Sequence, residues 1–552
     1  MSNEDPSELK AWRRIRRYAV PRQMIDECTL ARYEGDWQAT CAAGRVDVAF
    51  HPGDLRTRFG VRQAERLAAD LRSFAPDLLR WHLPRAMGGY TTVLTDAQLV
   101  LWPAAVPIKR TTPLLVVRTP KSVLGTQRLV LDIVLNKELR NHAIHVAAHR
   151  WDVRAAAELR TVVGGSNDRL PRFAPDGTPL PVRQWGAGDD IAARTERVLA
   201  HLERGEDQAA WEAAGIALTM AFKAGKVPPW WHREPNLTLM GAPVDPTAIV
   251  AEVRSLAANR GESSWALTLD YLTRFRLEVE AATGAVTARF QPYEGRESPF
   301  DKLPRITSQF IRRLPDLDLI WQGRMTAGEL HPLVRDALFP AAPPAGAEPA
   351  PEAIRVRCGT DWHFVGQDSG RLRIAEHDDA EVQRERVMRA LGGPMGGCFA
   401  VDQAWTAPVG RLPKELHRQR QGLWMRMLHG GTRTAVELLD TGMPPQLCDG
   451  RGRTLLHMLG TYDHAVLLPR LLAAGLDVDL RDGELQTPLA VAVSEGWPPA
   501  AIIALVDAGA NPHLTVANDM SVLDYLDRVL PSRQISKNAD FMAAVEYVRK
   551  RA

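Results

Sequence analysis

The segment HAIHVAAH, residues 142–149, places three histidines within eight residues. His142, His145 and His149 are spaced i, i+3 and i+7, which would align them on one face of a helix. Imidazoles on one face are able to bind a metal, but no acidic residue lies among them as in the HExxH arrangement. A polar helix face is the more common role of this spacing, and we predict no metal site here.

The cysteines also argue against metal or disulfide chemistry. There are five of them, an odd number, without any CxxC spacing: Cys28, Cys41, Cys358, Cys398 and Cys448. This pattern fits neither a disulfide framework nor a thiolate zinc site, and it is typical of a reducing cytoplasm.

A basic segment lies near the N-terminus. KAWRRIRRYAVPR, residues 10–22, contains six Lys or Arg residues, two aromatic residues and no acid. On a helix, Arg13, Arg16 and Arg17 would share a face, which is one way to contact nucleic acid or an anionic surface. A solvated helix face, or pairing with nearby acids, is the more common role, so nucleic acid is not the expected partner.

No motif of a known catalytic class is present. GGPMGG, residues 392–397, follows a predicted helix and lacks the Lys-Ser/Thr of a phosphate loop, and the chain contains no GxSxG or GxGxxG. We therefore predict no catalytic residues and no cofactor. An active site in residues 1–338 remains the alternative, for which a deep cleft that gathers His142, His145 or His232 with carboxylates would be the evidence.

The order of the predicted elements indicates several modules. The 552 residues suggest three to four domains. Helical segments at 7–43, interrupted around Pro21, and at 61–81 precede strand-like runs at 91–95, 98–102, 113–118 and 127–135. We expect residues 1–162 to form an α+β domain with an antiparallel sheet.

Two further modules follow. Residues 182–338 show helical character at 189–224 and a strand pair around the turn 282–284, as in a mixed α/β domain. The Pro/Ala-rich stretch 339–352 is predicted to be a linker. Residues 353–415 then read as a small α+β unit, with three strands before a helix that begins at Asp378–Asp379.

The C-terminal part repeats itself. TLLH at 454–457 recurs as TPLA at 487–490 and SVLD at 521–524, offset by 33 and then 34 residues. A glycine lies twelve residues before each of these, at Gly442, Gly475 and Gly509. A helix pair of this length buries its apolar face only against a neighbour, so the period predicts a stack of repeats.

These residues resemble the ankyrin repeat. The pattern is carried by Asp449, Gly452, Thr454, Leu456, His457, His464, Leu471, Leu472 and Gly475, and in the next unit by Asp482, Thr487, Pro488, Leu489, Gly496 and Gly509. Leu455 departs from the usual Pro, Ala490 and Asp524 from the usual His, and Val516 from the loop Asp. The resemblance implies an all-α ankyrin-repeat solenoid over 416–552, with degenerate units at both ends.

Ankyrin arrays bind proteins through their hairpin tips and concave helix face, so the resemblance implies a protein partner. The contact residues expected on this basis are Asp449, Arg451, Tyr462, Arg481, Asp482, Glu484, Trp497, Asn518 and Asp519. His457 and His464, like the helix-capping and core positions of the repeats, are expected to be structural.

Composition and pattern together predict a multidomain protein: α+β modules followed by the repeat solenoid. The 45% hydrophobic and 24% charged residues are typical of a soluble protein, and no window is long and apolar enough for a membrane span. Arginine far outnumbers lysine, which suggests a bacterial source, and we expect a cytoplasmic location. The predicted function is that of a non-catalytic adaptor; an enzyme or toxin-like effector with ankyrin repeats for targeting is the first alternative, and nucleic-acid or anionic-surface binding through 10–22 is the second.

Overall fold

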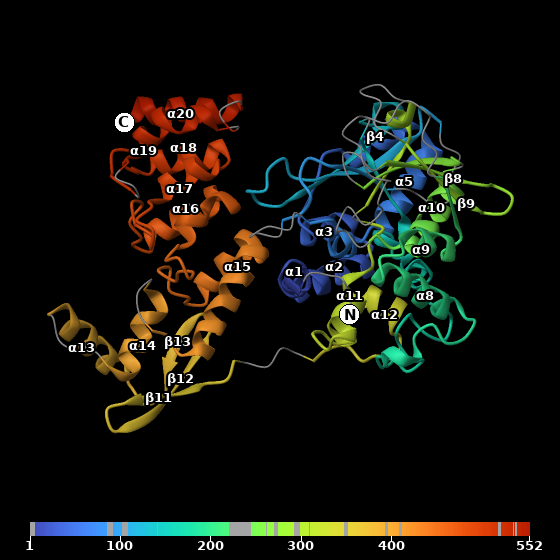
Figure 1. The fold of residues 1–552 in the computed structure, drawn as a ribbon. Coiled ribbons are helices and arrows are strands. Elements are labelled where there is room, and N and C mark those ends of the chain that lie inside the picture. Colours follow the sequence, from blue (N-terminus) through green and yellow to red (C-terminus); the bar gives the residue numbers. More distant parts are fainter. Residues whose placement is uncertain are drawn as a thin grey trace, which may run out of the picture. The chain divides into compact units, whose positions relative to one another are not determined.

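Figure 1 shows a computed structural model of the chain. It describes all residues except 1–5, 86–91, 102–108, 141, 220–243, 261, 270–273, 292–298, 309, 347–350, 392–395, 408–410, 517–519, 534 and 536–537. The chain forms two compact units, residues 1–123 with 128–346 and residues 124–127 with 347–552.

The first unit is built around one ten-stranded sheet with the order β1-β4-β3-β2-β5-β10-β7-β8-β9-β6. The strands are β1 (Val46–Val48), β2 (Gln98–Leu101), β3 (Pro113–Arg118), β4 (Leu129–Leu135), β5 (Ile144–Val146), β6 (Ile216–Thr219), β7 (Ser264–Thr268), β8 (Arg274–Val279), β9 (Val286–Phe290) and β10 (Arg305–Thr307). The α-helices are α1 (Pro6–Tyr18), α2 (Arg22–Tyr33), α3 (Trp37–Ala43), α4 (Leu55–Phe59), α5 (Val61–Ser73), α6 (Pro76–His82), α7 (Leu159–Val162), α8 (Ile191–Glu203), α9 (Asp207–Ala213), α10 (Pro246–Arg260), α11 (Pro315–Trp321) and α12 (Pro332–Leu338).

The sheet consists of two halves with the same topology. In each half a helix pair leads into an edge strand, β1 or β6, which pairs in parallel with the last strand of an antiparallel three-strand meander. The first strand of each meander then pairs in parallel with β5 or β10, and these two strands pair in parallel with each other at the centre. The strand order of the second half is the reverse of that of the first, and the two central strands are parallel. A rotation of 180° about an axis parallel to the strands therefore relates the two halves.

Such a half-turn places equivalent helices on opposite faces of the sheet, and the two cores agree with this. Neighbouring residues of β2 point to opposite faces: Leu99 belongs to the core that contains Leu67 and Leu71 of α5, whereas Val100 belongs to the core under α10. Strand β3 is an almost continuous apolar run because it is covered on both faces.

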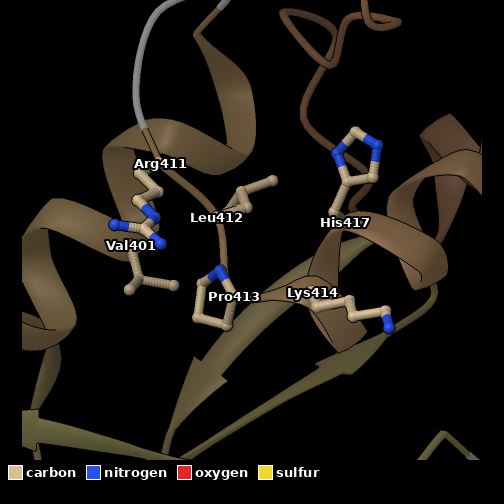
Figure 2. Close-up of a pocket in the computed structure, with 6 residues that line it drawn as sticks. All are labelled: Val401, Arg411, Leu412, Pro413, Lys414 and His417. Atoms are coloured by element: carbon tan, nitrogen blue, oxygen red, sulfur yellow. The ribbon is translucent and has the colours of Figure 1, made fainter.

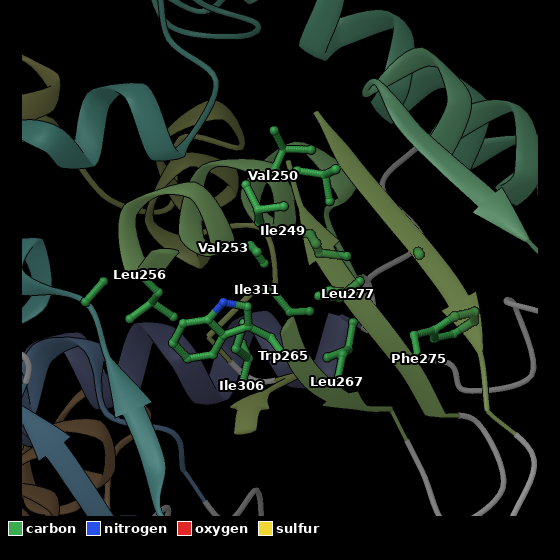
Figure 3. Packing of buried hydrophobic residues seen from close by; sticks show 14 of the residues in the cluster. Ile249, Val250, Val253, Leu256, Trp265, Leu267, Phe275, Leu277, Ile306 and Ile311 are labelled. Atoms are coloured by element: carbon green, nitrogen blue, oxygen red, sulfur yellow. The ribbon is translucent and has the colours of Figure 1, made fainter. Parts of the chain in front are cut away.

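The core under α10 joins the two halves. Figure 3 shows Ile249, Val253 and Leu256 of α10 packed towards Trp265 and Leu267 of β7. All five side chains are fully buried. The same cluster takes residues of β2 and β3 from the first half of the sheet, so one continuous core spans residues 100–311.

The first unit confirms the expected mixed α/β character. The predicted strands at 98–102, 113–118 and 127–135 are β2, β3 and β4, and they form an antiparallel meander. The sheet as a whole is mixed rather than antiparallel, because β1 and β5 join it in parallel. Strands from 1–162 and from 182–338 lie in this one sheet.

Two helix predictions in the first unit were wrong. HAIHVAAH is strand β5 followed by a short turn of 3₁₀-helix at 148–150, because Ile144 and Val146 complete the centre of the sheet. The expected helical stretch at 189–224 ends at α9, and residues 216–219 form edge strand β6. Tertiary pairing outweighs local propensity at both places.

The second unit begins with a small three-stranded antiparallel sheet, which is followed by two helices. The strands are β11 (Ile354–Cys358), β12 (Asp361–Asp368) and β13 (Arg371–Ile374), and the helices are α13 (Asp379–Ala390) and α14 (Gly397–Thr406). The predicted linker 339–352 lies between α12 and β11, and its residues 347–350 are outside the described part of the chain. Gly392–Gly393, the predicted end of the helix that became α13, also lie outside it.

The rest of the second unit is helical. It contains α15 (Lys414–Asp440), which is kinked at Gly431, a 3₁₀-helix (Leu455–Thr461), α16 (His464–Ala473), α17 (Pro488–Glu495), α18 (Pro499–Asp507), α19 (Val522–Arg528) and α20 (Ala539–Arg551). Each helix packs on its neighbours, with α17 against the 3₁₀-helix, α18 and α19, and α18 against α20. We call residues 416–552 the helical segment.

Across the described ranges of both units, no helix has the length and apolar character needed to span a bilayer.

Candidate protein-interaction surface

Three positions in the helical segment make the same backbone hydrogen bond, between residues four apart. The amide of Asp449 donates to the carbonyl of Arg453 at 3.0 Å, that of Asp482 to Gln486 at 2.9 Å, and that of Val516 to Met520 at 2.8 Å. The three bonds are offset by 33 and 34 residues, the period of the sequence repeat. The first two bonds close hairpin-like loops, 449–453 and 482–486, just before the next helix begins.

Aspartate side chains stiffen both of these loops. Asp449 Oδ1 accepts hydrogen bonds from the amides of Arg451 and Arg453, and Asp482 Oδ1 accepts from Glu484 and Gln486, all at 2.8–2.9 Å. Asp482 is buried, so its carboxylate holds the loop rather than facing a partner.

An ion-pair chain links the loops. Arg453 lies 3.3 Å from Asp482 and 2.8 Å from Glu495, which belongs to α17. In addition, the amide of Gly483 donates to the carbonyl of Arg451 at 2.7 Å. Neighbouring loops are therefore held in a defined relation to one another.

His457 connects two successive repeats. Its Nδ1 accepts from the amide of Thr454 at 3.2 Å, and its Nε2 lies 3.1 Å from the carbonyl of Gln486, to which it donates. Burial lowers the pKa of His457, and the nearby Asp482 carboxylate only partly opposes this. The neutral ring thus acts as a fixed bridge and is not available as a base or a metal ligand.

The other residues expected to be structural lie at helix ends or in the interior. Thr487 Oγ1 accepts from the amide of Ala490, and Pro488 is the first residue of α17. Gly475 and Gly509 follow α16 and α18 with φ of 84° and 95°, where a side chain would be strained. Leu456 and Leu489 are fully buried, and His464 opens α16 half-buried. Thr454 precedes a 3₁₀-helix instead of the expected α-helix.

Tyr462 and Trp497 do not form a contact surface, contrary to expectation. They are only 3% and 2% exposed. The Trp497 ring packs on Gly460, where an added Cβ would lie 2.5 Å from the ring atoms Cγ and Cδ2. Both aromatic residues follow the first helix of a sequence repeat, and Trp497 is buried against the 3₁₀-helix Leu455–Thr461.

The exposed part of the loops is small and mostly charged. Arg451, Arg481 and Glu484 are exposed at the tips, and Asp449 is half-buried. Leu485, which the sequence did not single out, is 56% exposed at the same tip with a left-handed φ of 62°. Its place directly after the turn residues Gly483 and Glu484 is the sequence feature from which its exposure could have been predicted. Asn518 and Asp519 lie outside the described residues.

The histidines proposed for an active site in the first unit do not assemble as one. His142 is exposed, whereas His145 is buried with its ring edge-on to Trp265 at 5.7 Å between centroids. His149 lies 3.5 Å from Glu252. His232 is outside the described residues.

The His149–Glu252 contact belongs to the core. Both side chains are fully buried, and Arg150 donates to Glu252 at 3.2 Å and to the carbonyl of Phe310 at 2.7 Å. Burial, reinforced by the Arg150 cation, lowers the pKa of His149 well below its usual range. A substrate has no access to this pair, so it gives no support to a catalytic role.

The basic segment near the N-terminus is partly a structural contact. Arg16 is buried and makes two hydrogen bonds to Asp316 of α11, at 2.9 and 2.6 Å. Arg13 and Arg17 remain exposed. The shared cationic face is therefore smaller than the helical spacing predicted, because its central residue joins α1 to α11.

A pocket beside the start of α15 is positively charged (Figure 2). It is lined by Val401, Arg411, Leu412, Pro413, Lys414 and His417. None of these residues is a carboxylate, and none is a cysteine or serine nucleophile. The lining does not match a hydrolytic site, and the pocket lies outside the range 1–338 where an active site was considered.

Comparison with known proteins connects the chain to ankyrin repeats over a short stretch. No family model matches the chain. Sixty-nine residues, 12% of the chain, are 35% identical to the Ankyrin repeat-containing protein P1E11.10 of Schizosaccharomyces pombe. The match covers 33% of that protein, so the chain spans about a third of its curated relative's length. This similarity supports ankyrin repeats and, in general terms, protein–protein interaction.

Proposed function

We propose that the chain is a non-catalytic protein-binding protein, with ankyrin repeats in 416–552 that contact a protein partner through their loop tips. The proposal draws on the short similarity to an ankyrin-repeat protein. It also draws on the three backbone hydrogen bonds that follow the period of the sequence repeat. Loops on a rigid scaffold are common binding sites.

Leu485 is the observation that carries the proposal furthest. A leucine at positive φ is conformationally unfavourable, and exposing its side chain to water adds to the cost. The bonds from Glu484 and Gln486 to Asp482 hold the loop in this shape on both sides of the leucine. An exposed apolar side chain that is held outward in this way is suited to insert into a partner.

The charges around Leu485 indicate what the partner offers. Arg451 and Arg481 are exposed on neighbouring tips, and Glu484 lies beside the leucine. Interfaces combine an apolar centre with a polar rim. The matching surface would present an apolar depression with carboxylates near its edge.

Site-specific photo-crosslinking tests the proposal. A photoreactive phenylalanine analogue is placed at Leu485 in the full-length chain and, as a matched control, at Val466 on α16, which is 45% exposed. We expect Leu485 to crosslink one defined protein from a lysate of the source cells, and Val466 not to. Equal crosslinking from both positions, or none from Leu485, contradicts the proposal.

Substitution then measures the contribution of the tip. Once the partner is identified, Leu485→Asp should weaken its binding by about tenfold or more, as for a central interface residue. Val466→Asp should leave the affinity unchanged. Thermal unfolding of both variants separates lost binding from lost folding.

A further inference from the structure

Four side chains that bind transition metals meet in the small sheet-and-helix part of the second unit. Cys358 ends β11, His363 lies in β12, His377 follows β13 and Cys398 lies in the first turn of α14. Their Sγ and ring-nitrogen atoms all lie within 4.8 Å of one another. The sequence spacing had argued against a thiolate zinc site, because these residues are separated by 5, 14 and 21 positions.

The distances fit one tetrahedral ion. With Zn–S of about 2.3 Å and Zn–N of about 2.0 Å, adjacent sulfur and nitrogen ligands lie about 3.5 Å apart. Cys358 Sγ is 3.6 Å from His377 Nε2, and Cys398 Sγ is 3.6 Å from His363 Nδ1. The two ring nitrogens are 2.9 Å apart, somewhat closer than the roughly 3.3 Å that the same geometry requires.

A carboxylate orients one of the rings. Glu381 Oε2 lies 3.2 Å from His377 Nδ1, on the side of the ring opposite to the cluster. With the proton held at Nδ1, the lone pair of Nε2 points to the two sulfurs and to His363. Histidine ligands of zinc commonly carry such an outer carboxylate.

The backbone brings Cys398 to the cluster through a close contact. Gly397 has φ of 58°, and a Cβ built there would lie 2.7 Å from Cys358 Sγ and 2.8 Å from Cys358 Cα. Only glycine permits this approach of α14 to the end of β11. Gly397 directly precedes Cys398 and contacts Cys358. A glycine at this position lets the two cysteines approach each other as two ligands of one metal ion must.

The three strands β11, β12 and β13 bury few apolar side chains. The three strands bury mainly Val356, Val365 and Leu372, whereas Trp362 and Phe364 are 53% and 49% exposed. A bound metal is a common supplement to a small apolar core of this kind. The free energy of metal binding then contributes directly to folding.

The ligand types select the metal. Two thiols and two imidazoles suit zinc and disfavour magnesium or calcium, which bind oxygen ligands. All five cysteines of the chain are free of disulfides in the structure, so both sulfurs are available. Four protein ligands leave no open position for a substrate, as in structural rather than catalytic zinc sites.

We propose that Cys358, His363, His377 and Cys398 bind one Zn²⁺ in a closed tetrahedral site, and that this site holds residues 354–406 in place as a cover on the first helices of the helical segment. The contacts of the cover are direct. Arg420 of α15 donates to the carbonyl of Ala404 at 2.8 Å, and within the cover Trp405 donates to the carbonyl of Gly370 at 2.8 Å.

The test begins with the metal content of the full-length protein, purified without a metal-binding tag. We expect close to one zinc per chain by elemental analysis. The double variant Cys358→Ser with Cys398→Ser should retain less than a tenth of this, while Cys448→Ser, which replaces another buried cysteine, should retain all of it. Zinc-free wild-type protein, or full zinc in the double variant, overturns the proposal.

Two further measurements keep the test valid if the double variant fails to fold. Wild-type protein stripped by a chelator and titrated with Co²⁺ should develop the absorption of tetrahedral thiolate-bound cobalt, and His377→Cys should also bind Co²⁺ with a stronger sulfur charge-transfer band. Glu381→Gln should weaken zinc affinity by about 10- to 100-fold without changing the stoichiometry at saturation. Absence of the tetrahedral cobalt spectrum in the wild type overturns the site.

Discussion

Replacing Gly460 with alanine tests the stacking of two repeats, because two effects of opposite sign compete at this position. Gly460 lies in the 3₁₀-helix Leu455–Thr461, and alanine in a helix is favoured over glycine by about 0.5–1 kcal/mol. If the new methyl group met open space, Gly460→Ala would stabilise the protein.

The structure predicts the opposite sign. The methyl carbon would lie 2.5 Å from Cγ and Cδ2 of Trp497 and 3.0 Å from its Cδ1. The ring is 2% exposed, and its Nε1 donates to Glu495 at 3.3 Å, so it has little room to move. Overpacking of a buried site costs about 1–3 kcal/mol. For a contact as short as 2.5 Å we take a cost of about 2–2.5 kcal/mol, and subtraction of the propensity gain of about 0.5–1 kcal/mol leaves a local destabilisation of about 1–2 kcal/mol for Gly460→Ala.

Hydrogen exchange of the full-length protein measures this locally. A loss of 1–2 kcal/mol corresponds to amide exchange about 5- to 30-fold faster in 455–461 and 488–507. Gly450→Ala is the matched control, since nothing lies within 4 Å of a Cβ built there. Combining Gly460→Ala with Trp497→Leu should cost less than the sum of the two. Slower exchange in Gly460→Ala alone would refute the packing of Trp497 on Gly460.

Three further predictions concern buried groups. Arg16→Met leaves the Asp316 carboxylate buried without its ion pair, so calorimetry should show the first unit destabilised by about 3–5 kcal/mol. The control Arg17→Met should have little effect, and equal effects of the two substitutions would contradict the pairing of Arg16 with Asp316. The pKa of His457 is lower in the folded than in the unfolded protein. As the pH falls below about 6.5, the unfolded state therefore takes up a proton more readily and the free energy of unfolding decreases. Protection of the amides in 455–461 against hydrogen exchange should decrease over the same pH range. A protection profile that stays flat down to pH 5, or one unchanged in His457→Asn, would speak against this bridge. Burial raises the pKa of Cys41 to about 12, so iodoacetamide at pH 8.5 should alkylate it only after denaturation; rapid labelling of the native protein would show that the thiol is accessible.

The predictions that held depend on local chemistry. The Val- and Leu-rich runs at 113–118 and 127–135 predicted β3 and β4 because strand propensity is carried by consecutive residues. The glycines at 475 and 509 predicted helix ends for the same reason, since a left-handed residue is a local requirement.

The failures concern residues whose role depends on distant neighbours. HAIHVAAH has helical spacing, yet strand β5 forms there because β2 and β10 pair with it from both sides. Tyr462 and Trp497 follow the first helix of a sequence repeat and were expected to be exposed, but both are buried, and Trp497 packs on Gly460 of the preceding repeat. Exposure is a property of the packed structure, not of a turn.

The sequence by itself predicted the 33- and 34-residue period of the C-terminal part and the three strands of the first meander, because each depends on residues close together in the chain. Only the tertiary structure decided that two sets of strands join in one sheet, that Arg16 finds Asp316 at a separation of 300 residues, and that Cys358, His363, His377 and Cys398 share one site. Such contacts arise when separate elements pack together, and no spacing along the chain encodes the distance between their side chains.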